Sequence, residues 1–134
     1  MRKFIKVVYL ALSRETLIEL DDSHNPKTVK AILENLPIKV IINKWGEELY
    51  TDKTPITVNE ENPTKQVNLF DVAYWPPSQA ICLFYGPTPI SKPNRILAYS
   101  PVNVVGRIIP YLDEKCNVLE KIHDKTMVFI KKIN

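Results

Sequence analysis

The sequence predicts a mainly β fold: a small antiparallel barrel or sandwich made of many short strands and one main helix. Three observations lead to this expectation. Short runs rich in valine, isoleucine and aromatic residues recur along the chain, only one segment has the apolar spacing of an amphipathic helix, and prolines interrupt the connections. The chain has 134 residues, with 11 prolines and 3 glycines, and is expected to form one domain, 1–134, with its own core.

The first two strands are expected at 3–12 and 16–20, joined by the polar residues 13–15. The N-terminus also resembles a signal peptide, because a basic start precedes an apolar stretch. Lys6 interrupts that stretch and leaves an apolar run too short for a signal peptide, so a strand is favoured. No segment is long enough to span a membrane, and a cytoplasmic location is expected.

The main helix is expected at 26–36. Asn25 provides an N-cap, and Pro26 occupies the first helical position, where its missing N–H is not needed. The apolar residues that follow have the spacing i, i+3, i+4 and i+7 of one helical face: Val29, Ile32, Leu33 and Leu36. Pro37 then ends the helix.

A hairpin is expected next, with strands at 38–42 and 47–51 around the loop 43–46, which contains asparagine and glycine. The remaining elements are a polar loop at 52–65 with a short strand at 56–58, strands at 66–70, 71–75, 79–85, 102–109 and 126–133, an extended loop at 86–101, and a short helix near 113–120. Four prolines in the segment 86–101 exclude a helix there.

Composition and charge argue against several functions. The formal net charge is +3 and the lysines are interspersed with acidic residues, so no nucleic-acid partner is expected. His24 and His123 have no ligand partner at helical or hairpin spacing, so no metal site is expected. The carboxylates at 21–22 are interpreted as partners of the helix N-terminus. With 3 glycines and no Gly-x-Ser-x-Gly motif, neither a phosphate-binding loop nor a serine nucleophile is indicated, and no cofactor is expected.

The two cysteines, Cys82 and Cys116, have no spacing typical of a disulfide framework or a redox motif. Cys82 lies in the apolar run AICLFY, where a cysteine behaves as a small buried hydrophobic residue. We therefore expect Cys82 to be buried, unbridged and slow to react with thiol reagents.

Four segments occur in a distinctive combination: NKWGEELYTDKTPI (43–56), ENP (61–63), DVAYWPPSQAICLFYGPTPIS (71–91) and SPVNVVGRI (100–108). With them the chain resembles a family of small prokaryotic proteins that have a cyclophilin-like fold and are mostly uncharacterised. The resemblance runs from Lys3 to Lys132 and implies a compact antiparallel β-barrel with a capping helix.

The resemblance also raises the question of prolyl isomerase activity. True cyclophilins place an arginine, in a Phe-His-Arg context, beside an apolar pocket that holds the proline ring. The corresponding strand here, IKVIIN at 38–43, has no arginine or histidine, and the arginines of the chain lie in no matching motif: Arg2, Arg14, Arg95 and Arg107. We expect little or no isomerase activity. As a substitute for the missing arginine, Arg95 in the proline-rich loop is better suited than Lys39, because an ammonium group lacks the planar fork of a guanidinium.

The segment Tyr74-Trp75-Pro76-Pro77 indicates a recognition surface. Neighbours on a strand point to opposite faces, so one ring should enter the core and the other should lie at a rim beside the prolines. The competing interpretation is that Trp75 closes the barrel end and the prolines only turn the chain. Glu47 and Glu48 should likewise point to opposite faces, and the sequence leaves open which of them faces a groove.

The favoured function is a non-catalytic binding module with an aromatic and proline-lined groove for an extended peptide or a small molecule. The candidate ligand-binding residues are Tyr50, Tyr74, Trp75, Phe84, Tyr85, Arg95 and Glu48, and the loop 86–101 is expected to border the groove. Two alternatives stay open: a weak or atypical peptidyl-prolyl isomerase that uses the same groove, and a subunit whose aromatic rim contacts another chain. The expected state is a monomer or a homodimer.

Overall fold

The computed structural model describes residues 3–109 and 117–133, and all elements below lie within these ranges. The strands are β1 (Lys3–Tyr9), β2 (Arg14–Leu20), β3 (Ile38–Trp45), β4 (Glu48–Thr51), β5 (Thr64–Val67), β6 (Asp71–Trp75), β7 (Ala80–Phe84), β8 (Ile96–Ile108) and β9 (Thr126–Lys132). The helices are α1 (Pro26–Asn35), a short 3₁₀ turn (Pro76–Ser78) and α2 (Asn117–Lys121). The mainly β architecture predicted from the sequence is confirmed.

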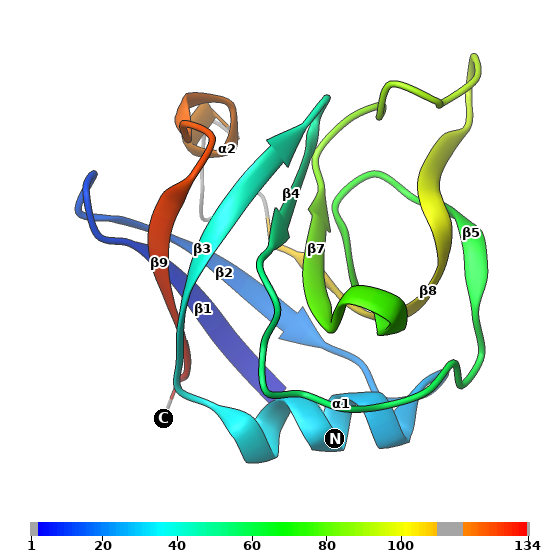
Figure 1. Ribbon diagram of the computed structural model, residues 1–134, viewed down its shortest axis with the longest axis horizontal. Coiled ribbons are helices and arrows are strands. Elements are labelled where there is room, and N and C mark those ends of the chain that lie inside the picture. The colour runs from blue at the N-terminus through cyan, green and yellow to red at the C-terminus, as the bar shows by residue number, and fades with distance from the viewer. Residues whose placement is uncertain (1–2, 110–116, 134) are drawn as a thin grey trace.

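Eight of these strands form a closed antiparallel barrel in the order β2-β1-β9-β3-β4-β7-β6-β8. A short ladder between β2 and β8 closes the ring, with Leu20 opposite Gly106 and Ile18 opposite Ile108. β5 pairs only with the first part of the long strand β8 and lies outside the ring. In Figure 1, α1 lies across one end of the barrel, and β5 and β8 curve away from its wall.

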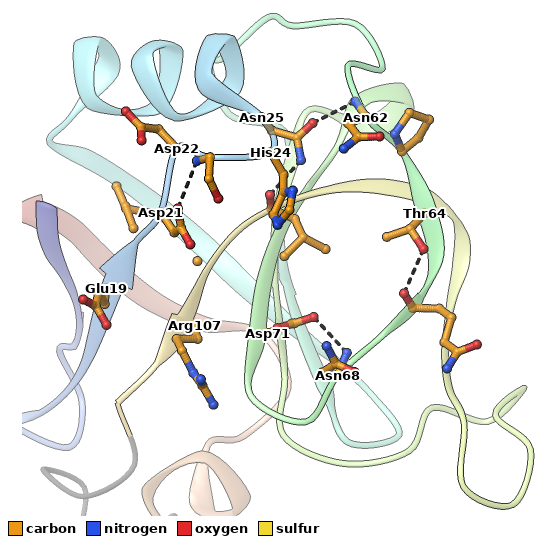
Figure 2. Close-up of a pocket in the computed structure, with 16 residues that line it drawn as sticks. Glu19, Asp21, Asp22, His24, Asn25, Asn62, Thr64, Asn68, Asp71 and Arg107 are labelled. Atoms are coloured by element: carbon orange, nitrogen blue, oxygen red, sulfur yellow. Dashed lines mark hydrogen bonds between the residues drawn. The ribbon is translucent and has the colours of Figure 1, made fainter. Parts of the chain in front are cut away.

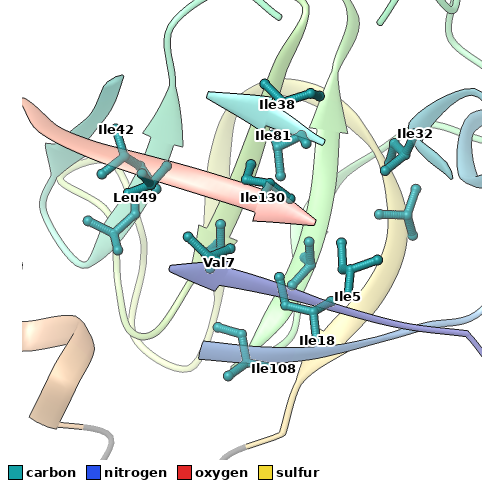
Figure 3. Packing of buried hydrophobic residues seen from close by; sticks show 14 of the residues in the cluster. Ile5, Val7, Ile18, Ile32, Ile38, Ile42, Leu49, Ile81, Ile108 and Ile130 are labelled. Carbon is teal, nitrogen blue, oxygen red and sulfur yellow. The ribbon is translucent and has the colours of Figure 1, made fainter. Parts of the chain in front are cut away.

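The main core fills the barrel interior and follows the alternation of side chains along each strand. Figure 3 shows this packing, in which aliphatic residues from most of the ring converge. Members include Ile5, Val7, Ile18, Ile42, Leu49, Ile81, Ile108 and Ile130 from the strands and Ile32 from α1. The apolar stripe predicted for the helix therefore faces the barrel end, as its spacing requires.

The helix N-terminus is capped differently from the sequence-based expectation. Pro26 does occupy the first turn, but the Asn25 side chain makes no cap hydrogen bond. Asn25 instead bridges two other segments: its Nδ2 donates to the carbonyl of Val104 (2.8 Å) and its Oδ1 accepts from the N–H of Asn62 (2.8 Å). Glu61 takes the capping role, because its carboxylate accepts from the backbone N–H groups of Lys27 and Thr28, each at 3.0 Å.

The β3–β4 hairpin has a tighter turn than the predicted loop at 43–46. β3 continues through Trp45, which pairs directly with Glu48, so only Gly46 and Glu47 form the turn. Gly46 has φ 60°, in the left-handed region that glycine adopts without strain. The tighter turn places Trp45 directly opposite Glu48 on the neighbouring strand.

Several other boundaries differ from the sequence-based expectation. The first strand, expected at 3–12, ends at Tyr9, and the second begins at Arg14 instead of 16. No strand forms at 56–58, although Ile56 is fully buried. The strand expected at 66–70 lies earlier, as β5, and β8 begins at Ile96 instead of 102. β8 accommodates Pro101 because its pairing with β5 is irregular at this point. Thr64 and Gln66 of β5 are separated by one residue, whereas their partners on β8, Val102 and Leu97, are separated by residues 98–101. Of the helix expected near 113–120, the part at 113–116 lies outside the described residues, and α2 covers the rest.

Candidate functional site

The wall formed by β4, β6 and β7 is buried on both faces. Ile81 and Leu83 of β7 face the main core, whereas Cys82 and Phe84 belong to a second apolar cluster on the outer face. Residues of β5 and β8, among them Val67, cover that outer face and complete the cluster. β5 and the first part of β8 thus lie over the outer face of this wall, and the space between them and the wall is partly enclosed.

A pocket of about 240 Å³, called here the aromatic pocket, opens beside this second cluster. Its lining comes from five strands: Trp45, Glu48, Tyr50, Trp75, Cys82, Ala98, Tyr99, Ser100 and Val102. Strand geometry explains the convergence, because Tyr50 pairs with Cys82 and Glu48 lies two residues before Tyr50 on the same face. Trp45 is also part of the lining because it pairs directly with Glu48 in the β3–β4 hairpin.

Three aromatic rings form the mouth of the aromatic pocket. Tyr99 is 65% exposed and contacts two tryptophans edge to face, Trp45 at 6.0 Å between ring centroids and Trp75 at 5.7 Å. The indole N–H of Trp75 donates to the hydroxyl of Ser100 at 2.6 Å, which fixes its orientation. The rings are therefore held in place by one another and by β8, while one of them stays largely open to solvent.

Among the described lining residues, Glu48 is the only acidic one, and it is buried, with 5% of its surface exposed. None of these described residues is a lysine, arginine or histidine. Burial raises the pKa of Glu48 from 4.5 to about 7, against the opposing effect of a hydrogen bond from the Cys82 thiol. The pKa of Cys82 is itself raised well above its usual range, by burial and by the nearby Glu48. The pocket thus holds a carboxyl group whose pKa is raised toward neutral pH by burial.

Of the candidate ligand-binding residues from the sequence, three line the aromatic pocket: Tyr50, Trp75 and Glu48. The others lie elsewhere. Tyr74 and Tyr85 belong to the main core, Phe84 is fully buried in the second cluster, and Arg95 is exposed in the loop before β8.

Sequence reasoning missed Trp45, Tyr99 and Cys82 as lining residues. A prediction of Gly46-Glu47 as a two-residue turn would have placed Trp45 opposite Glu48 and therefore at the pocket. Side chains alternate between the two faces of β7, and Cys82 lies on the outer face, which residues of β8 cover and which borders the pocket. Tyr99 lies in the segment 86–101 that was expected to border the groove, but nothing local distinguishes it from its neighbours.

Tyr74 has a structural role that can be separated from binding. Its hydroxyl donates to the carbonyl of Ile56 at 2.6 Å, and this carbonyl also accepts from the Gln79 side chain at 3.1 Å. Because the carbonyl keeps one partner, we expect Tyr74→Phe to lower the free energy of unfolding by only about 1 kcal/mol. Urea titration measures the change, and a loss above about 3 kcal/mol would contradict this assignment.

A second, wider hollow of about 800 Å³ lies between the segment before α1, the residues 62–68 and the end of β8 (Figure 2). Its lining is polar and includes Asp21, Asp22, His24, Asp71 and Arg107. Internal hydrogen bonds hold much of it: the N–H of Ser23 donates to Asp21 at 2.9 Å, and the N–H of Asn68 donates to Asp71 at 2.8 Å. Among the described residues, no three histidine, cysteine, aspartate or glutamate side chains are grouped as metal ligands would be. These hydrogen bonds hold the segments 21–23 and 68–71, which border the hollow.

The closed antiparallel barrel, with a helix over one end and a pocket against its outer wall, defines a compact class of β-barrel domain. The chain belongs to the cyclophilin-like family, whose sequence model matches residues 4–131. It is also similar to a hypothetical protein from Archaeoglobus fulgidus of known solution structure, with 38% identity, a TM-score of 0.79, and coverage of 98% of this chain and 95% of that chain. No curated protein matches the chain. The family assignment made from the sequence motifs is confirmed.

None of the described helices combines the length and the apolar character needed to cross a bilayer.

Proposed function

We propose that the chain is a binding module whose aromatic pocket receives a small molecule or one side chain of an extended peptide. The observation that carries this proposal is the pocket itself: four aromatic rings surround one buried carboxyl group in a volume of about 240 Å³. A site for a drug-sized ligand is usually larger, about 300 Å³ or more. The volume therefore suits a compact group of roughly the size of an amino-acid side chain.

The chemistry of the lining supports binding over catalysis. The Cys82 thiol is fully buried, and its raised pKa keeps it protonated, so it is a poor nucleophile. None of the described residues that line the pocket is an arginine that could stabilise a twisted X-Pro bond. Arg95, considered from the sequence as a substitute, is exposed in the loop before β8, and Arg107 lines the polar hollow of Figure 2. These placements favour the binding module over the prolyl isomerase.

Titration of the ¹⁵N-labelled protein with blocked amino acids tests the proposal. The probes are the N-acetyl amides of leucine, phenylalanine, proline, glutamine, glutamate and lysine. We expect at least one probe to shift the backbone amides of Glu48, Tyr99 and Ser100, with saturation at millimolar concentration. Trp75→Ala should weaken that binding about tenfold or more, because it removes one wall of the pocket.

Tyr74→Phe is the matched control, since Tyr74 neighbours Trp75 on β6 but points into the main core. This variant should bind the probe as the wild type does. Shifts confined to residues outside the pocket, or no shift with any probe, would refute the proposed function.

A further inference from the structure

The aromatic pocket contains a combination of groups that the proposed function alone does not explain. An apolar ligand needs no carboxyl group, and burying one costs free energy unless it is paired. Glu48 is nevertheless 5% exposed and lies among Trp45, Tyr50 and Trp75. Among the described residues, its side-chain partner in the pocket is the Cys82 thiol, a weak hydrogen-bond donor. None of the described residues that line the pocket carries a positive charge.

The aromatic residues have the complementary property. The face of an indole or phenol ring carries negative electrostatic potential and attracts a cation within about 6 Å of the ring centre. The pocket combines two tryptophans and two tyrosines around a group that is negative when ionised. Edge-to-face contacts hold Tyr99 at 74° to Trp45 and at 67° to Trp75, so Tyr99 is stacked flat on neither tryptophan. All four aromatic residues line the pocket, where their rings can contact a ligand.

We propose that the pocket binds the cationic head of a ligand that carries a methylated ammonium group, with Glu48 as its counter-ion. This inference rests on the proposed function and specifies its ligand.

Hydrogen-bonding capacity decides between kinds of cation. A primary ammonium has three N–H donors to satisfy, and a guanidinium has five. Besides Glu48, the side-chain oxygen acceptors among the described lining residues are the hydroxyls of Tyr50, Tyr99 and Ser100, and the Ser100 hydroxyl already accepts from Trp75. A tertiary or quaternary ammonium needs one acceptor or none, and its methyl groups contact aromatic faces well. The lining therefore matches a methylated ammonium best.

Because Glu48 is the counter-ion, the affinity of the pocket for a cationic ligand should depend on pH. Its pKa is about 7 because of burial, so the negative partner of the cation forms as the pH rises through neutrality. The titratable groups that face it are the Cys82 thiol from β7 and the hydroxyls of Tyr50 on β4 and Tyr99 on β8. Burial and Glu48 raise the pKa of Cys82, which keeps the thiol neutral in this range. A permanently charged ligand should consequently bind more tightly above about pH 7 than below it.

The test compares choline with 3,3-dimethyl-1-butanol, its uncharged carbon analogue of nearly the same shape. Both are titrated into the protein while tryptophan fluorescence and ¹⁵N chemical shifts are recorded at about pH 5.5 and about pH 8.5. We expect choline to bind about tenfold more tightly than the neutral analogue at the higher pH. The preference should fall severalfold or more at the lower pH, whereas binding of the analogue should not change.

Two variants separate the charge from the shape of the pocket. Glu48→Gln should weaken choline binding about tenfold at the higher pH and remove its pH dependence, with little effect on the analogue. Glu47→Gln is the matched control, because this neighbouring carboxylate lies outside the pocket lining, and it should bind as the wild type does.

The outcomes distinguish this inference from the proposed function on which it rests. Equal binding of the two probes would overturn the cation inference and leave an apolar binding pocket. Choline binding that survives Glu48→Gln without loss would also overturn the assignment of the counter-ion. If neither probe binds while a blocked amino acid does, the cation inference fails and the binding module stands. If no probe of either set reaches the pocket, both proposals fail.

Discussion

Replacing Gly106 by alanine is expected to lower the free energy of unfolding by about 3 kcal/mol or more. Gly106 lies at the seam that closes the barrel, opposite Leu20 on β2 and Val72 on β6. A Cβ atom at this position would overlap the carbonyl oxygen of Glu19 and lie 3.0 Å from the Cα of Leu20. Both are backbone atoms of a paired strand, so no side-chain rotation relieves the overlap, and β2 must move away from β8.

Thermal and urea unfolding measure this effect, and a shift of the melting temperature by about 10 °C is expected for a chain of this size. Gly106→Val should be worse than Gly106→Ala, because its branched side chain needs more room at the same seam. Lys39→Ala, at an exposed position on β3, is the control and should change stability by less than about 0.5 kcal/mol. A Gly106→Ala protein as stable as the wild type would mean that the β2–β8 ladder does not close the barrel in this register.

Glu48 is expected to make the protein less stable as the pH rises from about 4.5 to about 7. Its pKa is raised from 4.5 to about 7 by burial, so between these values the folded protein keeps a proton that the unfolded chain has lost. The unfolded state then binds fewer protons, and the free energy of unfolding falls with increasing pH. The full loss is at most about 3 kcal/mol, reached above about pH 7 and absent below about pH 4.5.

Urea unfolding of the wild type and of Glu48→Gln between about pH 4.5 and about pH 8 isolates this contribution, because glutamine does not titrate. The variant should gain stability relative to the wild type across the window, and Glu47→Gln should retain the wild-type pH dependence. A difference between wild type and Glu48→Gln that is the same at every pH would show that Glu48 titrates normally. A cation bound in the aromatic pocket should offset the same loss, since it stabilises the ionised carboxylate.

Local patterns in the sequence were sufficient for most of the fold. The helix at 26–36 was predicted from Pro26 and an apolar stripe, and the structure has it at Pro26–Asn35. Alternation along the strands predicted that one of Tyr74 and Trp75 enters the core and the other lies at a rim, and Tyr74 is the one that is fully buried. The apolar neighbours of Cys82 predicted a buried, unbridged thiol, which is confirmed. Each of these features depends on residues within a few positions of one another.

The boundaries that failed depend on pairing between distant segments. Pro101 was expected in a loop because proline weakens a ladder, yet the register shift between β5 and β8 lets β8 pass through it. Asn25 was expected to cap α1, but the carboxylate of Glu61 occupies that place and Asn25 bridges Asn62 and Val104. No local sequence pattern around residue 25 indicates that residue 61 lies beside it in the folded protein.

By itself, the sequence determined the family, the β-rich architecture, the main helix and the presence of aromatic residues beside a pair of glutamates. Only the tertiary structure decided which of these residues meet. The two-residue turn at Gly46 selects Glu48 over Glu47 for the pocket, and the curvature of β8 brings Tyr99 against Trp45 and Trp75. The physical reason is that alternation assigns a side chain to a face, whereas the environment of that face also depends on strands that are distant in the sequence.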